Sequence, residues 1–213
     1  MKALHKHASV LLNVRRKRGY LLPYHRLLHA IAPELLAAYD EFYTQFTLTG
    51  RALTPVQKET VWIALIAATR ARVGTIHLAR AVKAGMSRDA IADAVALAAA
   101  CEALDVHAFA ENAFPEWLSH QRLAKRYLRG FDAARGSTRP ALAEIAAVVA
   151  HAARRNAAGM RIHLVRAFRR GAKRAQVAEA LCFVLLHCGG PTMVDAMECW
   201  LKLVRERRVP APY

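Results

Sequence analysis

Apolar residues recur at every third or fourth position along most of the chain, which is the spacing of one face of an α-helix. The alternation of apolar and polar residues that is typical of strands is almost absent. The pattern therefore predicts an all-α fold. The expected helices cover residues 34–47, 55–70, 87–104, 106–114, 140–156, 160–170, 174–187 and 191–206, together with a helix around His77 that stops at Gly85.

None of the apolar runs is long enough to cross a membrane as a helix, which takes roughly 18–20 residues without charge. The runs at residues 60–69 and 90–101 are apolar but shorter. They indicate core helices, and we expect no transmembrane segment.

One ten-residue stretch occurs twice. The copies are Ile-His-Leu-Ala-Arg-Ala-Val-Lys-Ala-Gly at residues 76–85 and Ile-His-Leu-Val-Arg-Ala-Phe-Arg-Arg-Gly at residues 162–171. Each has a histidine three residues before an arginine, and residues with this spacing lie on one face of a helix. His77 can therefore point the same way as Arg80, and His163 the same way as Arg166.

The repeat extends to the helix before each copy. Pro55 and Pro140 each open an apolar run, and proline suits the first helical turn, where its missing N–H costs nothing. A glutamate follows each proline by four residues, at Glu59 and Glu144. The first run also begins with the Thr-x-x-Gln spacing of a capping box.

These matches predict two copies of one helical unit. Such a unit cannot bury its apolar face alone, so the two halves should pack together. The expected organisation is a basic N-terminal arm over residues 1–32, a first helical repeat over 33–120, a connector over 121–137 and a second helical repeat over 138–213.

The chain is strongly basic, with 32 Lys and Arg against 16 Asp and Glu and a formal net charge of +16. Such a charge can favour anionic ligands, nucleic acid or membrane surfaces, but basic side chains also simply solvate a surface. The basic residues are spread along the chain, apart from the cluster at residues 15–18, and no nucleic-acid-binding motif accompanies them. We expect a small anionic substrate and no specific nucleic acid.

The cysteines and the unrepeated histidines do not form a pattern of ligands. The four cysteines contain no Cys-x-x-Cys pair, which favours buried apolar roles and a reducing, cytoplasmic location. His25 and His29 have a spacing that a helix can use to bind a metal, but no third ligand is placed to complete the set. We therefore expect no metal site.

These features together resemble the carboxymuconolactone decarboxylase and alkylhydroperoxidase-D superfamily. The resembling features are the proline-glutamate helix start, the His-Leu-x-Arg-Ala-x-x-x-Gly block, the following Glu/Asp-containing helix and Cys-Gly-Gly-Pro at residues 188–191. The resemblance covers about residues 30–205 as two tandem copies. It implies a homo-oligomer, in which a trimer of tandem chains would replace six single units.

The two branches of this superfamily differ in whether they carry a pair of cysteines. Its peroxidase-like branch resembles a thiol oxidoreductase, with Cys-x-x-Cys placed so that a histidine follows the second cysteine by four residues. The corresponding positions here are Arg70 and Val73 in the first copy, and Asn156 and Gly159 in the second. Both copies lack both thiols, so a peroxidase-like oxidoreductase is the least favoured function.

The decarboxylase branch has no such thiols, and both copies match its His-x-x-x-Ala-x-x-x-Gly block. Only the second copy has the downstream Gly-x-Pro. This resemblance implies loss of carbon dioxide from a lactone that carries carboxylates. We interpret the chain as a lyase, a cofactor-free decarboxylase or lactone-processing enzyme acting on a small anionic ring acid. The alternative is a non-catalytic scaffold or small-ligand-binding member.

Such a reaction needs a group that moves a proton and a cation that holds a carboxylate. We take His163 as the first acid/base candidate, with Glu144 orienting or protonating it and Arg166 binding a substrate carboxylate. His187, just before the Gly-Gly-Pro turn, is a second acid/base candidate.

The equivalent set of the first copy is Glu59, His77 and Arg80. Each residue type has a structural alternative. A glutamate near a helix start stabilises the helix dipole by ~0.3–1 kcal/mol. The arginines can pair with acids on neighbouring helices, and the histidines can hydrogen-bond a helix end.

Overall fold

The computed structural model describes residues 2–118 and 120–213, with side chains described over 10–118 and 122–213. This part of the chain forms eleven α-helices and no β-strand, which confirms the all-α prediction. The chain divides into two compact units, Met1–Thr49 and Gly50–Tyr213. Within the described residues, no helix is both long enough and apolar enough to cross a membrane.

The helices of the first unit are α1 (Lys2–Arg18), α2 (Pro23–Ile31) and α3 (Pro33–Tyr43), followed by the π-helical turn η1 (Thr44–Leu48). Those of the second unit are α4 (Pro55–Ala68), α5 (Thr75–Lys83), α6 (Arg88–Ala113), α7 (His120–Ala134), α8 (Pro140–Ala153), α9 (Ala157–Arg169), α10 (Arg174–Cys188) and α11 (Gly190–Arg205), with the 3-10 turn η2 (Arg72–Gly74) before α5.

A buried ion-pair network holds the first unit together. Asp40 of α3 accepts hydrogen bonds from Arg18 and Lys17 at the end of α1, each over 3.0 Å. The Arg18 guanidinium lies over the Tyr43 ring, 3.8 Å from its centroid, and 3.1 Å from Nε2 of His25. Burial, with the nearby Arg18 charge, lowers the pKa of His25 to about 4. His25 is thus a neutral packing residue of this unit.

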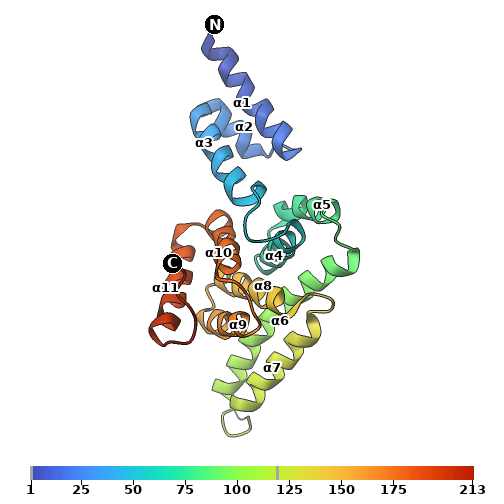
Figure 1. Cartoon of the computed structure of the whole chain (residues 1–213), viewed down its shortest axis with the longest axis vertical. Helices are drawn as coiled ribbons and strands as arrows, with labels where there is room; N and C mark the ends of the chain where they lie inside the picture. The colour runs from blue at the N-terminus through green and yellow to red at the C-terminus, as the bar shows by residue number, and fades with distance from the viewer. Residues whose placement is uncertain (1, 119) are drawn as a thin grey trace. The chain divides into compact units, whose positions relative to one another are not determined.

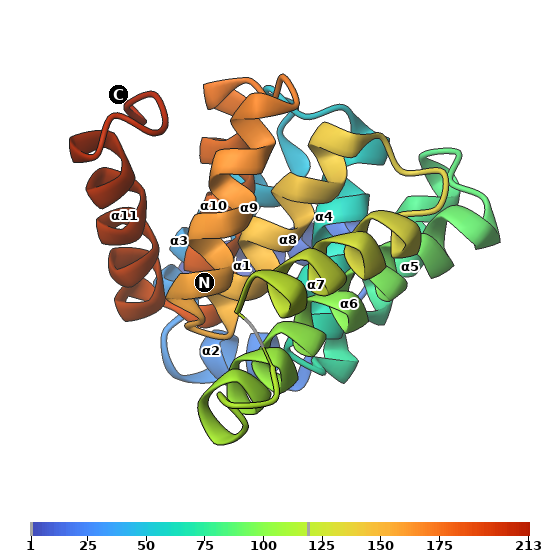
Figure 2. The same cartoon turned by 90° about the horizontal axis from the view of Figure 1, so that it is seen from below.

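Helices α4 and α8 pack side by side at the centre of the second unit (Figures 1 and 2). Both are apolar on nearly all faces, as expected for helices covered on every side. Small buried residues such as Ala64, Ala143 and Ala147 lie between them and allow a close approach. Helices α5 and α6 pack on α4, α9 and α10 pack on α8, and each half also reaches the central helix of the other.

The expected start of α4 is confirmed. Thr54 Oγ1 accepts a hydrogen bond from the Gln57 amide over 3.3 Å, and the Gln57 side chain accepts one from the Thr54 amide over 3.0 Å. Pro55 follows at the first helical position, where no N–H is needed. This capping box fixes the end of α4 that carries Glu59.

Helix α6 is continuous, whereas the sequence pattern predicted two helices that meet near Asp105. The prediction was wrong because no residue there breaks a helix. In the second half, at the positions 86 residues later, the chain does break. Gly189 adopts a φ of 88° and Pro191 opens α11. One long helix in the first half therefore stands where the second half has α10 and α11.

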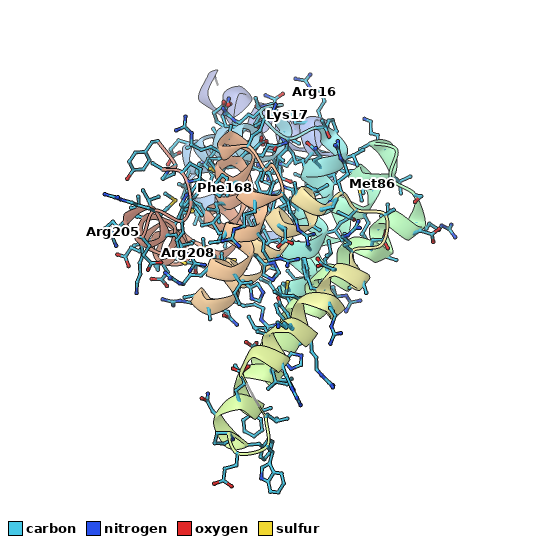
Figure 3. All side chains as sticks on the ribbon, turned by 60° about the horizontal axis from the view of Figure 1, so that its bottom comes forward. Arg16, Lys17, Met86, Phe168, Arg205 and Arg208 are labelled. Carbon is cyan, nitrogen blue, oxygen red and sulfur yellow. The ribbon has the colours of Figure 1, made fainter. Side chains whose placement is uncertain are left out.

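Helix α7 occupies most of the stretch that the sequence analysis assigned to the connector. Leu123, Tyr127 and Phe131 are buried at i, i+4 and i+8, which places them on one face. This face packs on α6, and the two helices run side by side in Figures 1 and 3. The basic residues of α7 lie on its exposed side.

Helix α11 packs against α9 and α10. Phe168 of α9, labelled in Figure 3, lies with its ring centroid 5.8 Å from that of Trp200. The Trp200 indole donates a hydrogen bond to the Pro210 carbonyl over 2.9 Å. This bond ties the last residues to the body of the unit.

Candidate active site

The first glutamate–histidine pair joins α4 to α5. Nδ1 of His77 lies 2.8 Å from Oε2 of Glu59, and the two residues are only 4% and 5% exposed. The Glu59 carboxylate accepts the hydrogen bond from Nδ1, which leaves Nε2 on the opposite side of the ring. No hydrogen bond joins this Nε2 to any group in the described part of the chain. The ring of His77 is therefore oriented by the hydrogen bond at Nδ1, while Nε2 remains without a hydrogen bond to the described residues.

Aromatic rings cover one face of His77. Trp62 stacks on it with ring centroids 4.4 Å apart and an angle of 21° between the planes. Phe183 of α10 stacks on Trp62 at 4.8 Å. The indole Nε1 of Trp62 is buried and has no hydrogen-bond acceptor among the described groups. The surroundings of His77 are thus poorly solvated, and they include one buried N–H, that of Trp62, without an acceptor among the described groups.

His187 lies at this first pair, although the sequence placed it beside the residues of the second copy. Its Nε2 is 2.8 Å from the Thr69 hydroxyl, and its ring meets Trp62 edge-on at 6.1 Å. Burial, together with the nearby His77, lowers the pKa of His187. The physical reason for its place is that α10 packs against α4 of the other half.

The second glutamate–histidine pair joins α8 to α9. Nδ1 of His163 lies 2.6 Å from Oε2 of Glu144, and both residues are fully buried. Nε2 of His163 is bonded to the Tyr127 hydroxyl over 2.5 Å. Burial lowers the pKa of His163, against the opposing effect of Glu144. Both ring nitrogens are occupied, unlike those of His77.

A cluster that the sequence did not predict surrounds this pair. The Tyr127 hydroxyl also lies 3.1 Å from Nε2 of His151, whose ring stacks on His163 at 5.2 Å. Cys101, expected only to pack, brings its thiol into the same group. The Cys101 sulfur and one nitrogen of each of the two histidines all lie within 4.8 Å of one another. Four helices contribute, so no short-range spacing could reveal the cluster.

The electrostatics of the cluster favour neutral groups. Burial raises the pKa of the Cys101 thiol to about 12 and lowers the pKa of His151 to about 3. Thiol nucleophiles act as thiolates, which this environment disfavours. This environment therefore disfavours Cys101 as a replacement for the missing peroxidase thiols.

Gly159 shows why a thiol is absent from its position. A Cβ atom there would overlap the imidazole of His151. The resembling peroxidases have their second cysteine at this point, four residues before the histidine. In this chain the His151 ring fills that space, so a side chain at position 159 would require His151 to move.

Arg166 of the second repeated block makes ion pairs with two acids. Nε of Arg166 donates to Glu144 over 2.8 Å, and its Nη2 donates to Asp132 over 2.6 Å. Arg166 is therefore held by two acids from neighbouring helices, the alternative that the sequence left open. Arg80 lies one turn after His77 on α5 and is partly exposed.

Two acids hold the halves together in a reciprocal way. Glu179 of α10 accepts a hydrogen bond from the Leu53 amide over 2.7 Å, just before α4, and pairs with buried Lys58 at 3.3 Å. Asp93 of α6, 86 residues earlier, accepts from the amide and hydroxyl of Ser137, just before α8, over 2.8 and 2.7 Å. Each half thus anchors the loop that leads into the other.

The second unit has two hollows beside its helices. One, of about 580 Å³, is an open hollow along α7 lined by Arg122, Lys125, Arg126, Leu128, Arg129 and Asp132. Another, of about 250 Å³, lies among α4, α5 and α6. Neither is lined by His77 or His163.

The fold and the site define an all-α protein with two buried glutamate–histidine pairs. The family model of the carboxymuconolactone decarboxylase family matches residues 33–114, which include Glu59, His77 and Arg80. The match bears out the resemblance over the first of the two expected copies. No curated protein gives a significant match. No solved structure gives one either.

Proposed function

We propose that the chain is a cofactor-free decarboxylase or lactone-processing enzyme of the carboxymuconolactone decarboxylase type, acting on a small anionic ring acid. The observation that carries the proposal is the state of His77. Glu59 fixes its Nδ1 at 2.8 Å, while its Nε2 has no bonded group in the described part of the chain. A histidine held in this way can give or take a proton at one defined atom.

The proposed reaction breaks the bond between a ring carbon and its carboxylate. The electron pair of that bond moves into the conjugated lactone, and carbon dioxide leaves. Nε2 of His77, protonated before the step, delivers one proton to the ring, so one proton enters for each carbon dioxide lost. Glu59 stabilises the charged imidazole that donates it. The apolar surfaces of Trp62 and Phe183 favour conversion of a carboxylate into a neutral gas.

Substrate binding is assigned to the remaining polar groups of the first site. Arg80 follows His77 by one helical turn and would hold a second carboxylate by a bidentate hydrogen bond. His187, whose ring meets Trp62 edge-on at 6.1 Å, is the second acid/base group. In this proposal the Glu144–His163 pair, with Arg166, belongs to the supporting half, because its groups are already satisfied.

A non-catalytic small-ligand-binding member is the second candidate. His77 is only 4% exposed, and neither of the two hollows named above reaches it. A ligand would then bind without reaction, and the buried pairs would serve stability.

A panel of small carboxylated lactones and ring-fission acids, read by thermal shift and carbon dioxide release on the same samples, separates the two. A thermal shift with release supports the decarboxylase. A shift without release indicates a binder or another lactone reaction. No response across the panel would refute the proposed substrate class.

We also propose a homo-oligomer, a trimer of chains that each carry two tandem units. Exposed apolar side chains gather at the end of α6 and in the turn after it, including Val106, Phe109 and Trp117, which are 67%, 63% and 84% exposed. Such a patch is unusual on a monomer. Light scattering coupled to gel filtration tests this directly, and a monomeric mass at micromolar concentration would refute it.

A further inference from the structure

We propose that Cys101, His151 and His163 bind a divalent transition-metal ion of the zinc type, with the Tyr127 hydroxyl as the fourth ligand. The Cys101 sulfur and a nitrogen from each histidine lie within 4.8 Å of one another. The ligands come from α6, α8 and α9, and Tyr127 comes from α7. A metal here would join four helices across the two halves.

The ligand atoms already converge on one point. Nε2 of His163 and Nε2 of His151 lie 2.5 and 3.1 Å from the same Tyr127 oxygen. Small adjustments of these side chains would bring the four atoms to the distances that zinc prefers, about 2.0–2.3 Å from a central ion. Each of the four residues is at most 2% exposed, so the cluster is closed to bulk water.

A second and independent feature is the carboxylate behind His163. Metal-bound histidines commonly donate their other ring N–H to a carboxylate, which fixes the tautomer and strengthens the ligand. Glu144 occupies this position at 2.6 Å from Nδ1. Arg166 and Arg170 hold Glu144 in turn, at 2.8 and 3.3 Å from its Oε1. Because Nδ1 is bonded to Glu144, the lone pair on Nε2 of His163 points toward the cluster.

The donor set determines the class of ion. One thiolate and two imidazoles suit zinc and related borderline ions, and a set with no open position is typical of a structural site. Binding would convert the Cys101 thiol to a metal-bound thiolate and release one proton, with no change of oxidation state. The site has no opening, so we expect the ion to enter during folding.

This inference stands apart from the proposed acid/base chemistry. The metal ligands belong to the second pair and its neighbours, whereas the proposed reaction uses His77 and Glu59 of the first. Loss of the metal would weaken the fold, and loss of His77 would stop turnover in a folded protein. The two proposals can therefore fail separately.

The test measures metal content and a spectroscopic signature. Protein is produced with zinc in the medium, and metal is counted per chain by mass spectrometry. A second sample is unfolded in chelator and refolded with Co²⁺, whose bond to a thiolate gives a charge-transfer absorption band. We expect one zinc per chain, the cobalt band, and a raised melting temperature in the metal-bound protein.

The variants assign the signal to the cluster. Cys101→Ser should remove the band, and His151→Gln should lower the zinc content at least tenfold. Cys199→Ser, a buried cysteine outside the cluster, should keep both. If a variant fails to fold, the wild-type protein still decides the matter. Wild-type protein with no zinc and no cobalt band, or a band lost equally in Cys199→Ser, would overturn the proposal.

Discussion

The hydroxyl of Tyr127 lies 2.5 Å from Nε2 of His163 and closes the second glutamate–histidine pair. In the first pair, Nε2 of His77 makes no hydrogen bond in the described part of the chain, so this pair has no such cap. Two similar sequence blocks thus have different local chemistry. The difference comes from α7, a helix that contacts the second pair and belongs to neither block.

Removing the cap should cost stability. Tyr127→Phe leaves Nε2 of His163 and of His151 buried without the bonds they make now. We expect the free energy of unfolding to fall by about 1–3 kcal/mol, the usual cost of unsatisfied buried polar groups. Urea denaturation measures this. Tyr213→Phe, at a residue that is 83% exposed, should change it by less than about 0.5 kcal/mol. Equal effects of the two changes would contradict this account.

Gly159→Ala should destabilise the protein although alanine favours helices. The added Cβ would overlap the His151 ring, which is 1% exposed and has little room to move. We expect a loss of about 2 kcal/mol, typical of overpacking a core. The matched control is Gly190→Ala, where a Cβ would meet nothing within 4 Å. A Gly159→Ala protein as stable as the control would show that His151 does not fill this space.

The reciprocal acids should contribute unequally. Glu179→Ala removes a buried carboxylate that pairs with Lys58 and accepts the Leu53 amide, and should cost about 3 kcal/mol, the usual scale for breaking a buried pair. Asp93→Ala removes two hydrogen bonds near the surface and should cost about 1 kcal/mol. Denaturant unfolding of both variants measures the two losses in the free energy of unfolding. A loss for Glu179→Ala no larger than that for Asp93→Ala would show that the buried pair contributes little.

The first unit should weaken in acid through His25. Its pKa is about 4 in the folded chain, below the ordinary 6.5, so the unfolded chain binds more protons between these values. Stability is therefore complete above about pH 6.5 and is lost as pH falls toward 4. Allowing for solvent screening, we expect a loss of about 1 kcal/mol between pH 7 and 5.

Two measurements check this pH dependence. An NMR titration gives the pKa of His25 directly, and amide exchange in α2 at pH 7 and pH 5 gives the local stability. His25→Gln should remove most of the difference between the two pH values. A titration of His25 near its ordinary pKa in the folded protein would rule out the mechanism.

Much of the fold follows from local sequence signals. The prolines at the starts of α4 and α8, the Thr-x-x-Gln capping box and the 3.6-residue period each act within a few residues, so they can be read along the chain. The break near Asp105 was mispredicted because a short change of pattern was taken as a helix end without a residue that enforces one.

The site was less predictable, because its parts come from distant segments. Both glutamate–histidine pairs were expected from the repeated spacing, and the structure brings each pair together. The place of His187 beside His77 depends on packing between the halves. Cys101 and Tyr127 join their cluster through α6 and α7, which no repeat or motif connects.

The central claim is that His77 carries the chemistry, and the most direct test is the turnover of its variant. His77→Gln and His107→Gln are compared on whichever panel compound releases carbon dioxide with the wild-type protein. His107 is partly exposed on α6 and outside the first pair. Circular dichroism and melting temperature verify that both variants are folded.

We predict that His77→Gln lowers kcat at least ~100-fold, the typical contribution of general acid–base catalysis. His107→Gln should stay within about threefold of the wild type, in keeping with a surface substitution. A folded His77→Gln protein with the wild-type kcat would contradict the assignment and return the search for the acid/base group to His187 and His163.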